Sequence, residues 1–70
     1  MSVWPSTRAK LVLRALKKIG WIEVGQVGSH LKLSRAGYEN YIWAFHDGAE
    51  IGPKMLSKIA KHTGLRPGDL

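Results

Sequence analysis

Residues 21–35 decide the fold and read WIEVGQVGSHLKLSR. Residues 21–25 alternate between apolar and polar or small types. Residues 30–35 alternate again, with Leu31 and Leu33 on one side of the run. Gly28 lies in the stretch 26–29 between the two runs, where glycine favours a turn. The sequence therefore predicts two strands, 21–25 and 30–35, joined by a turn.

A third strand is predicted over residues 38–46, which read YENYIWAFH. Gly37 allows a tight reversal before it, and the segment is rich in the aromatic and β-branched residues that favour strands. Alternation gives this strand two sets of side chains, and either set can face the interior of the protein. One set is Tyr41, Trp43 and Phe45. The other set is Ile42, Ala44 and His46. The sequence leaves this choice open.

Amphipathic helices are predicted on both sides of the strands. The first spans residues 7–19, with Ser6 as its N-cap and Gly20 at its end. The second begins at Pro53, which suits a first helical turn, and stops at Gly64. Apolar positions recur at helical spacing on one side of each helix: Ala9, Val12, Leu13, Leu16 and Ile19 in the first, and Leu56, Ile59, Ala60 and Thr63 in the second. Basic residues line the opposite side of each helix. They are Lys10, Arg14, Lys17 and Lys18 in the first helix and Lys54, Lys58 and Lys61 in the second.

This order of elements, α-β-β-β-α, predicts an α+β fold in a single domain covering residues 1–70. Each helix has one apolar stripe to bury, so the economical packing is a three-stranded antiparallel sheet with both helices on one face. We expect Ile22, Val24, Leu31 and Leu33 to point at the helices. The alternate residues Glu23, His30 and Lys32 then face solvent on the open side of the sheet.

The charge of the chain favours a polyanionic partner. Eleven Lys and Arg residues against five Asp and Glu give a net charge of 11 − 5 = +6. Residues 1–20 and 53–66 hold nine of the eleven positive charges and no acid. Such segregation favours nucleic acid first and a membrane surface second.

The composition also limits where in the cell the protein is expected and which kinds of site it can contain. The chain has no cysteine, which excludes disulfides and thiolate metal ligands, and we expect a cytoplasmic protein. No apolar run approaches the length needed to span a bilayer, and basic residues interrupt the N-terminal apolar positions, so neither a membrane anchor nor a signal peptide is predicted.

The tripeptide Gly28-Ser29-His30 is the sharpest candidate for chemistry. It lies where a turn enters a strand, and histidine exchanges protons near neutral pH. His46, at the end of the third strand, is the residue that we expect to approach His30. Three widely spaced histidines without supporting acids do not predict a metal site. The glycines match neither a P-loop nor a dinucleotide pattern, so no cofactor is expected.

The ordered set of motifs resembles the HicA family of bacterial toxins. The set comprises a helix ending in Gly20-Trp21, the Gly28-Ser29-His30 motif, and then His46, Glu50, Gly52, Leu56, Ile59 and Gly64-Leu65. The resemblance covers roughly residues 6–70. It implies a double-stranded-RNA-binding-like α-β-β-β-α fold and an mRNA interferase that a cognate HicB antitoxin holds inactive. It also implies that His30 is the essential histidine. The chain departs from many relatives at Leu31 and at Ala44-Phe45.

The resemblance implies cleavage of mRNA by a ribonuclease, and the mechanism that we hypothesise for it requires no metal. The hypothesis is that His30 acts as general base on a ribose 2′-hydroxyl, with His46 as candidate second proton carrier. The predicted RNA-binding residues are Ser29, Lys32, Lys10, Arg14, Lys17, Lys54, Lys58 and Lys61. Two other classes of function stay open. A non-catalytic RNA-binding module would bind without cutting, and an interaction protein would dock a partner through an exposed aromatic face.

Overall fold

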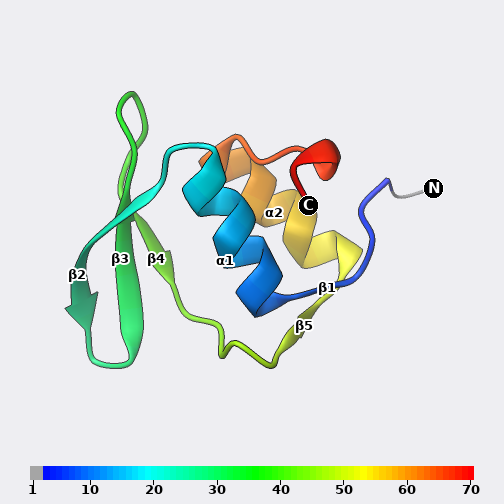
Figure 1. Ribbon diagram of the computed structural model, residues 1–70, viewed down its shortest axis with the longest axis horizontal. Coiled ribbons are helices and arrows are strands. Elements are labelled where there is room, and N and C mark those ends of the chain that lie inside the picture. Colours follow the sequence, from blue (N-terminus) through cyan, green and yellow to red (C-terminus); the bar gives the residue numbers. More distant parts are fainter. Residues whose placement is uncertain (1–2) are drawn as a thin grey trace.

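The predicted hairpin is present and forms part of a layer at one side of the protein (Figure 1). The computed structural model describes residues 3–70. Strands β2 (Ile22–Val27) and β3 (His30–Ser34) pair antiparallel, and Val27 pairs with His30 across the two-residue turn Gly28-Ser29. Gly28 has φ 62°, a left-handed conformation that glycine adopts without steric cost. The turn is therefore tighter than the predicted stretch 26–29, and β2 is correspondingly longer than predicted.

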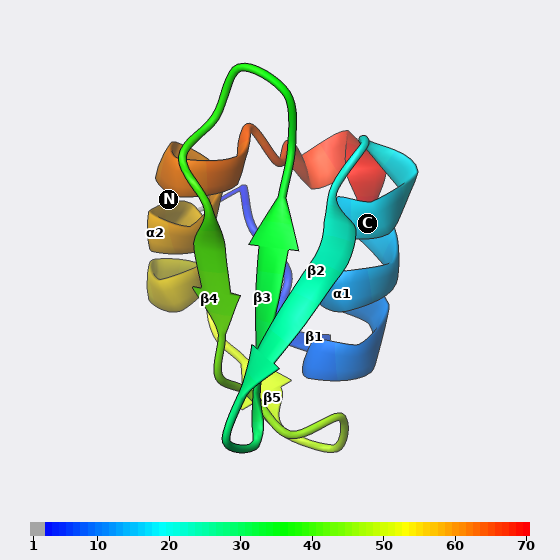
Figure 2. The ribbon, with the colours of Figure 1, turned by 90° about the vertical axis from the view of Figure 1, so that its left-hand side faces the viewer.

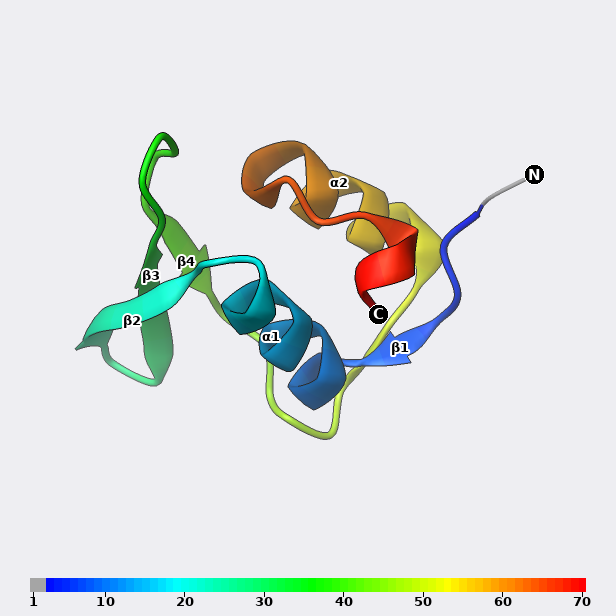
Figure 3. The same ribbon diagram turned by 45° about the horizontal axis from the view of Figure 1, so that its top comes forward.

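The hairpin belongs to a three-stranded antiparallel sheet with the order β2-β3-β4, where β4 is Tyr41–Trp43. Helices α1 (Ala9–Lys18) and α2 (Pro53–Thr63) both lie behind this sheet, α1 behind β2 and α2 behind β4, as Figure 2 shows. The predicted α+β architecture is confirmed. A short 3-10 turn, Pro67–Asp69, lies beyond the helices on the side away from this sheet (Figures 1 and 3).

The register of β3 and β4 settles which set of β4 side chains faces the helices. Leu31 pairs with Trp43 and Leu33 with Tyr41, and directly paired residues share a face. Leu33 and Trp43 are buried. Phe45, just beyond the strand, packs on Trp43 with ring centroids 5.0 Å apart. The aromatic set therefore points inward, and Ile42 lies outside next to Lys32.

The prediction for β2 is wrong at Ile22 and Val24, whose side chains are 60% and 50% exposed. The cause is an irregularity between Glu23 and Gly25 that places one extra residue in β2. Because side chains alternate, one inserted residue moves the preceding positions to the other face. Glu23 consequently shares the helix-facing side with Leu33, and its Oε1 lies 3.2 Å from the Lys17 Nζ.

Helix α1 is shorter than the predicted 7–19. Thr7 and Arg8 form a two-residue strand, β1, that pairs antiparallel with β5 (Glu50–Ile51). Ser6 is not the N-cap. The cap position is Arg8, which makes no side-chain capping bond. The amides of the first turn instead donate to the loop between β4 and β5: Ala9 N to the Ala49 oxygen at 2.8 Å and Lys10 N to the Asp47 oxygen at 3.2 Å.

The predicted third strand, 38–46, is also too long. The chain turns at Gly37, which has φ 86°, and the Tyr38 amide donates to the Arg35 oxygen at 3.1 Å. After Trp43 the chain leaves the sheet to reach the first turn of α1. Strand pairing is therefore restricted to Tyr41–Trp43.

The ends of both helices follow the sequence signals. Gly20 follows α1 with φ 112°, and Gly64 ends α2 with φ 76°, while Pro53 begins it. At the end of α2 the Thr63 oxygen accepts from the Trp21 Nε1 at 3.0 Å and from the Arg35 Nη1 at 3.2 Å. The predicted apolar stripes meet in one core with Leu33, Trp43 and Ile51. No helix in residues 3–70 has the length and apolar character needed to cross a membrane.

Candidate functional site

His30 is the first residue of β3 and projects from the sheet face that the helices leave uncovered. The register fixes this side, because Leu31 and Leu33 alternate with it and point at the core. His30 is exposed, as predicted. Its imidazole makes no hydrogen bond or ion pair within residues 3–70. Both ring nitrogens are therefore available to a bound molecule.

Lys32 stands two residues further along β3 on the same open face. Its direct neighbours are Gly25 in β2 and Ile42 in β4. The glycine leaves space on one side, and the isoleucine, 44% exposed, supports the aliphatic stem on the other. An imidazole and an ammonium group thus project side by side from a largely aliphatic surface. We name His30 and Lys32 the open-face pair.

The two other residues predicted near this site lie at its margin. Ser29 occupies the exposed turn immediately before His30. His46 is exposed in the loop after β4. Pairing between β3 and β4 ends at Leu31 and Trp43, so no residue of β4 pairs with His30, and His46 follows three residues after the strand, where the chain has left the sheet. The His46 oxygen accepts from the Ala49 amide at 2.9 Å, so the backbone of His46 is held in this loop.

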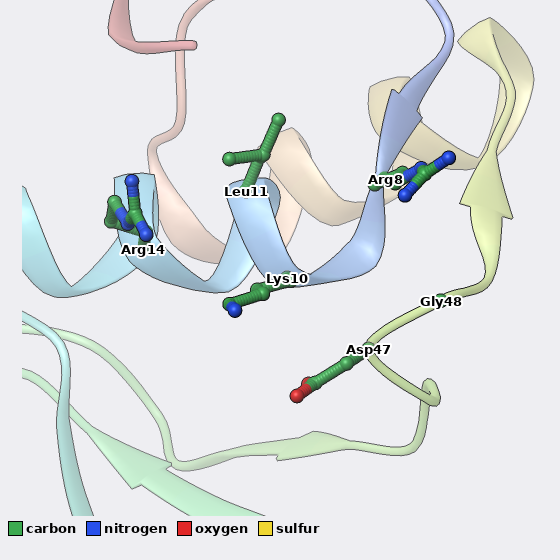
Figure 4. Close-up of a pocket in the computed structure, with 6 residues that line it drawn as sticks. All are labelled: Arg8, Lys10, Leu11, Arg14, Asp47 and Gly48. Carbon is green, nitrogen blue, oxygen red and sulfur yellow. The ribbon is translucent and has the colours of Figure 1, made fainter.

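The basic stripe of α1 borders a groove on the surface. Two adjoining hollows, of about 380 and 300 Å³, lie between α1 and the loop that follows β4, and they share Lys10, Arg14 and Asp47. Lys17 lines one of them, and Arg8 and Leu11 the other. Figure 4 shows the helix carrying Lys10 and Arg14 on one side and Asp47 on the facing loop. We name these two hollows together the α1 groove.

The basic stripe of α2 has a different setting. Lys54, Lys58 and Lys61 are exposed, as predicted, but none of them lines either hollow of the α1 groove. The sequence treats the two lysine stripes alike, whereas in the fold only the stripe of α1 lines the α1 groove.

Arg8 is a groove residue that the sequence analysis missed. The predicted helix 7–19 places Arg8 in its first turn, and the sequence assigns this residue no role beyond its contribution to the positive charge of the N-terminal segment. Its position follows from the β1–β5 pairing, in which Arg8 lies opposite Glu50. Two-residue strands leave no periodic signal in a sequence, so the pattern could not have revealed it.

His62 differs from the other two histidines. It is stacked on Tyr41, with ring centroids 5.8 Å apart and an interplanar angle of 23°. Burial raises the pKa of the Tyr41 hydroxyl above its usual value of 10.0. Within residues 3–70, no three histidine or acidic side chains gather into a group able to hold a metal ion.

The family comparison covers nearly all of this architecture. The family model for the HicA toxin of bacterial toxin–antitoxin systems matches residues 9–65. The chain belongs to the HicA toxin family. No curated protein and no solved structure matches it. The match runs from the first residue of α1 to just beyond α2, so it includes the whole three-stranded sheet and the open-face pair.

Membership of the HicA family assigns the chain the role of toxin in a toxin–antitoxin system, with a cognate antitoxin as its partner. Most of the α1 groove lies inside the matched region of this HicA toxin, and Arg8 lies just before it. The shared part of the fold therefore contains two exposed surfaces that carry basic side chains. One is the open face of the sheet, and the other is the groove beside α1.

Proposed function

We propose that this HicA toxin is an endoribonuclease that cleaves mRNA in the cytoplasm without a metal ion, using His30 as general acid and base. The observation that carries the proposal is the state of His30, exposed on the open sheet face with no intramolecular partner and with Lys32 beside it. A free imidazole can accept or donate a proton near neutral pH.

The chemistry begins at a ribose 2′-hydroxyl. His30 takes its proton while the oxygen attacks the adjacent phosphorus, so a new P–O bond forms as charge builds on the phosphate oxygens. Lys32 projects from the same face and stabilises this charge as a nearby cation. The bond from phosphorus to the 5′-oxygen then breaks, and that oxygen takes a proton from a second donor. The products are a 2′,3′-cyclic phosphate and a 5′-hydroxyl.

His46 is the first candidate for the second proton donor. It is exposed in the loop that follows β4, the strand that pairs with β3. The backbone of this loop is held by hydrogen bonds, so an approach of the His46 imidazole to the leaving oxygen must come from its side chain or from the bound RNA, and hydrogen bonds of catalytic groups often tighten only with substrate. Ser29, in the turn between β2 and β3, is placed to contact the RNA backbone.

The test is incubation of a structured mRNA with the purified full-length chain in EDTA, followed by analysis of the fragment ends. We expect cyclic phosphate and 5′-hydroxyl ends. His30→Ala should cut about 10²–10⁴-fold more slowly, which is the usual contribution of general acid–base catalysis. His46→Ala should slow the reaction as well and should flatten one limb of its pH–rate profile.

His62→Ala provides the matched control, because it removes another exposed histidine that lies on α2 and stacks on Tyr41. It should keep the cleavage rate. Thermal melts of all variants would show that they fold. Binding of RNA without cleavage by the wild type would instead identify a non-catalytic RNA-binding module. Failure to bind RNA, together with tight binding of the antitoxin, would leave an interaction protein.

A further inference from the structure

We propose that the α1 groove holds the RNA backbone that leads to His30, and that the lysine stripe of α2 takes no part in substrate binding. This inference rests on the proposed ribonuclease function, because it assigns the substrate contacts of that activity. It separates two stripes that look equivalent in the sequence, and it adds Arg8 to the contacts.

The charges of the groove are arranged for a chain of anions. Arg8, Lys10 and Arg14 line it and make no ion pair within residues 3–70. Asp47 is the one acid among the lining residues of its two hollows. Cations without internal partners need no rearrangement before they meet phosphates, so their attraction for an incoming polyanion is kept.

The spacing of these cations suits a nucleic-acid backbone. Lys10, Arg14 and Lys17 recur every three or four residues, so they follow one side of α1, and Lys17, the last of them, is shared with Glu23 in an exposed ion pair. At 1.5 Å per residue, the seven steps from Lys10 to Lys17 cover roughly 10 Å of helix axis. The cations therefore form a row along which the backbone of a nucleic-acid strand can run.

The wall of the groove opposite α1 is held in place by the helix itself. The carbonyls of Asp47 and Ala49 accept the first-turn amides of α1, so the loop is tied to the helix at two points. These amides are consequently occupied, and binding must use the side chains that line the groove rather than the helix N-terminus. A tied loop preserves the concave shape before the ligand arrives, which lowers the entropy cost of binding.

The position of the groove connects it to His30. The β2–β3 turn, next to His30, and the loop carrying Asp47 lie at the same end of the molecule, the lower end in Figures 1 and 2. The first turn of α1 also lies toward this end (Figure 1). A strand of RNA following the groove therefore leaves it at the end of the molecule where β3 begins, and it must pass around the β2–β3 turn to reach His30 on the opposite face of the sheet.

The test measures binding alone, on a His30→Ala background that leaves the RNA intact. A fluorescent single-stranded RNA oligonucleotide is titrated at several salt concentrations with two double variants. Lys10→Ala with Arg14→Ala changes the groove. Lys54→Ala with Lys58→Ala removes the same charge from α2 and serves as the matched control.

The groove pair should weaken binding at least tenfold at physiological salt. It should also reduce the magnitude of the slope of log affinity against log salt by about 1.4, because each of the two lost phosphate contacts contributes about 0.7 to that slope. The α2 pair should change affinity less than about twofold. A charge-preserving double variant, Lys10→Arg with Arg14→Lys, should retain most of the affinity and shows that the loss comes from charge rather than misfolding.

Equal losses for the groove pair and the α2 pair would overturn the proposal, since only net charge would then matter. Unchanged RNA affinity of the groove pair combined with loss of antitoxin binding would also overturn it and assign the groove to the protein partner. The failure of the ribonuclease proposal has a different signature. In that case the unmutated chain cuts no RNA, while the binding comparison between the two pairs still gives its answer.

Discussion

The two faces of the three-stranded sheet use neighbouring residues of the same strands for different purposes. On the face toward the helices, Leu33 and Trp43 are buried and pack with Tyr41 and Phe45. On the open face, the imidazole of His30 makes no hydrogen bond or ion pair within residues 3–70, and Ile42 is 44% exposed. One strand, β3, supplies side chains to both faces.

This difference in burial predicts that stability and the proposed chemistry can be changed separately in a very small protein. A residue on the inner face contributes through the apolar area that it removes from water. A residue on the open face contributes little to that burial, so its identity is free to serve a ligand. The following experiments test how complete this separation is.

The largest effect is expected at Leu33. Leu33→Ala removes a fully buried side chain and should lower the free energy of unfolding by about 2–5 kcal/mol. A domain of this size has about 4–10 kcal/mol in total, so the variant should be partly unfolded. The neighbouring change on the open face, Ile42→Ala, should cost about 1 kcal/mol or less. Urea unfolding followed by tryptophan fluorescence measures both.

Similar losses for Leu33→Ala and Ile42→Ala would contradict the separation of the two faces. They would mean that the open face is covered in solution, for example by a second copy of the chain. Measuring the melting temperature at several protein concentrations would detect such association, because a dimer gains stability with concentration.

A smaller effect, confined to alkaline pH, is expected at Tyr41 on the inner face. Burial raises the pKa of its hydroxyl, so the unfolded chain loses this proton before the folded protein does. The folded state then binds more protons, and the free energy of unfolding falls as pH rises above 10.0. The Tyr41→Phe variant has no hydroxyl at this position, so its free energy of unfolding should decrease less than that of the wild type as pH rises. Urea unfolding of both proteins between about pH 9 and pH 11 tests the prediction. Identical pH dependence would show that the hydroxyl is fully hydrated.

The smallest effect is expected at Glu23, the acidic residue that β2 places on the helix side. Its pair with Lys17 joins two side chains that are 45% and 48% exposed. Such pairs contribute about 0.2–1 kcal/mol. Glu23→Gln should lower stability within that range at low salt and less at high salt. Glu39→Gln, which removes an exposed acid without an ion pair in residues 3–70, is the control and should have no such salt-dependent effect.

The sequence predicted those parts of the fold that repeat a local pattern. Helices α1 and α2 each carry several turns of apolar spacing, and Leu31 and Leu33 alternate cleanly in β3, so these elements and their buried sides were right. The prediction for β2 is wrong because one extra residue in the strand reverses the alternation, and Gly25, the glycine inside the strand, is the signal that could have indicated this bulge. The pair β1–β5 was missed because two residues per strand carry no period.

The candidate site was predictable only as a set of residues. The exposure of His30 follows from alternation in β3, because its neighbour Leu31 faces the core. The α1 groove does not follow from any local pattern, since it forms where α1 meets a loop from a distant part of the chain. Charges can be read from a sequence, but the concave surface that collects them depends on tertiary contacts such as the bond from Lys10 N to the Asp47 oxygen.

The capping of α1 by distant carbonyls has a consequence for biosynthesis. The partner of the Ala9 amide, the Ala49 oxygen, is encoded 40 positions later (49 − 9), and the core residues Leu56 and Ile59 follow later still. Contacts of such long range form slowly and cannot form on a chain that is still short. A nascent or prematurely terminated product therefore contains His30 without the folded sheet that presents it. The sheet and α1 therefore reach their final packing only after residues 49–59 have been made, so the open face on which His30 lies is assembled late in synthesis.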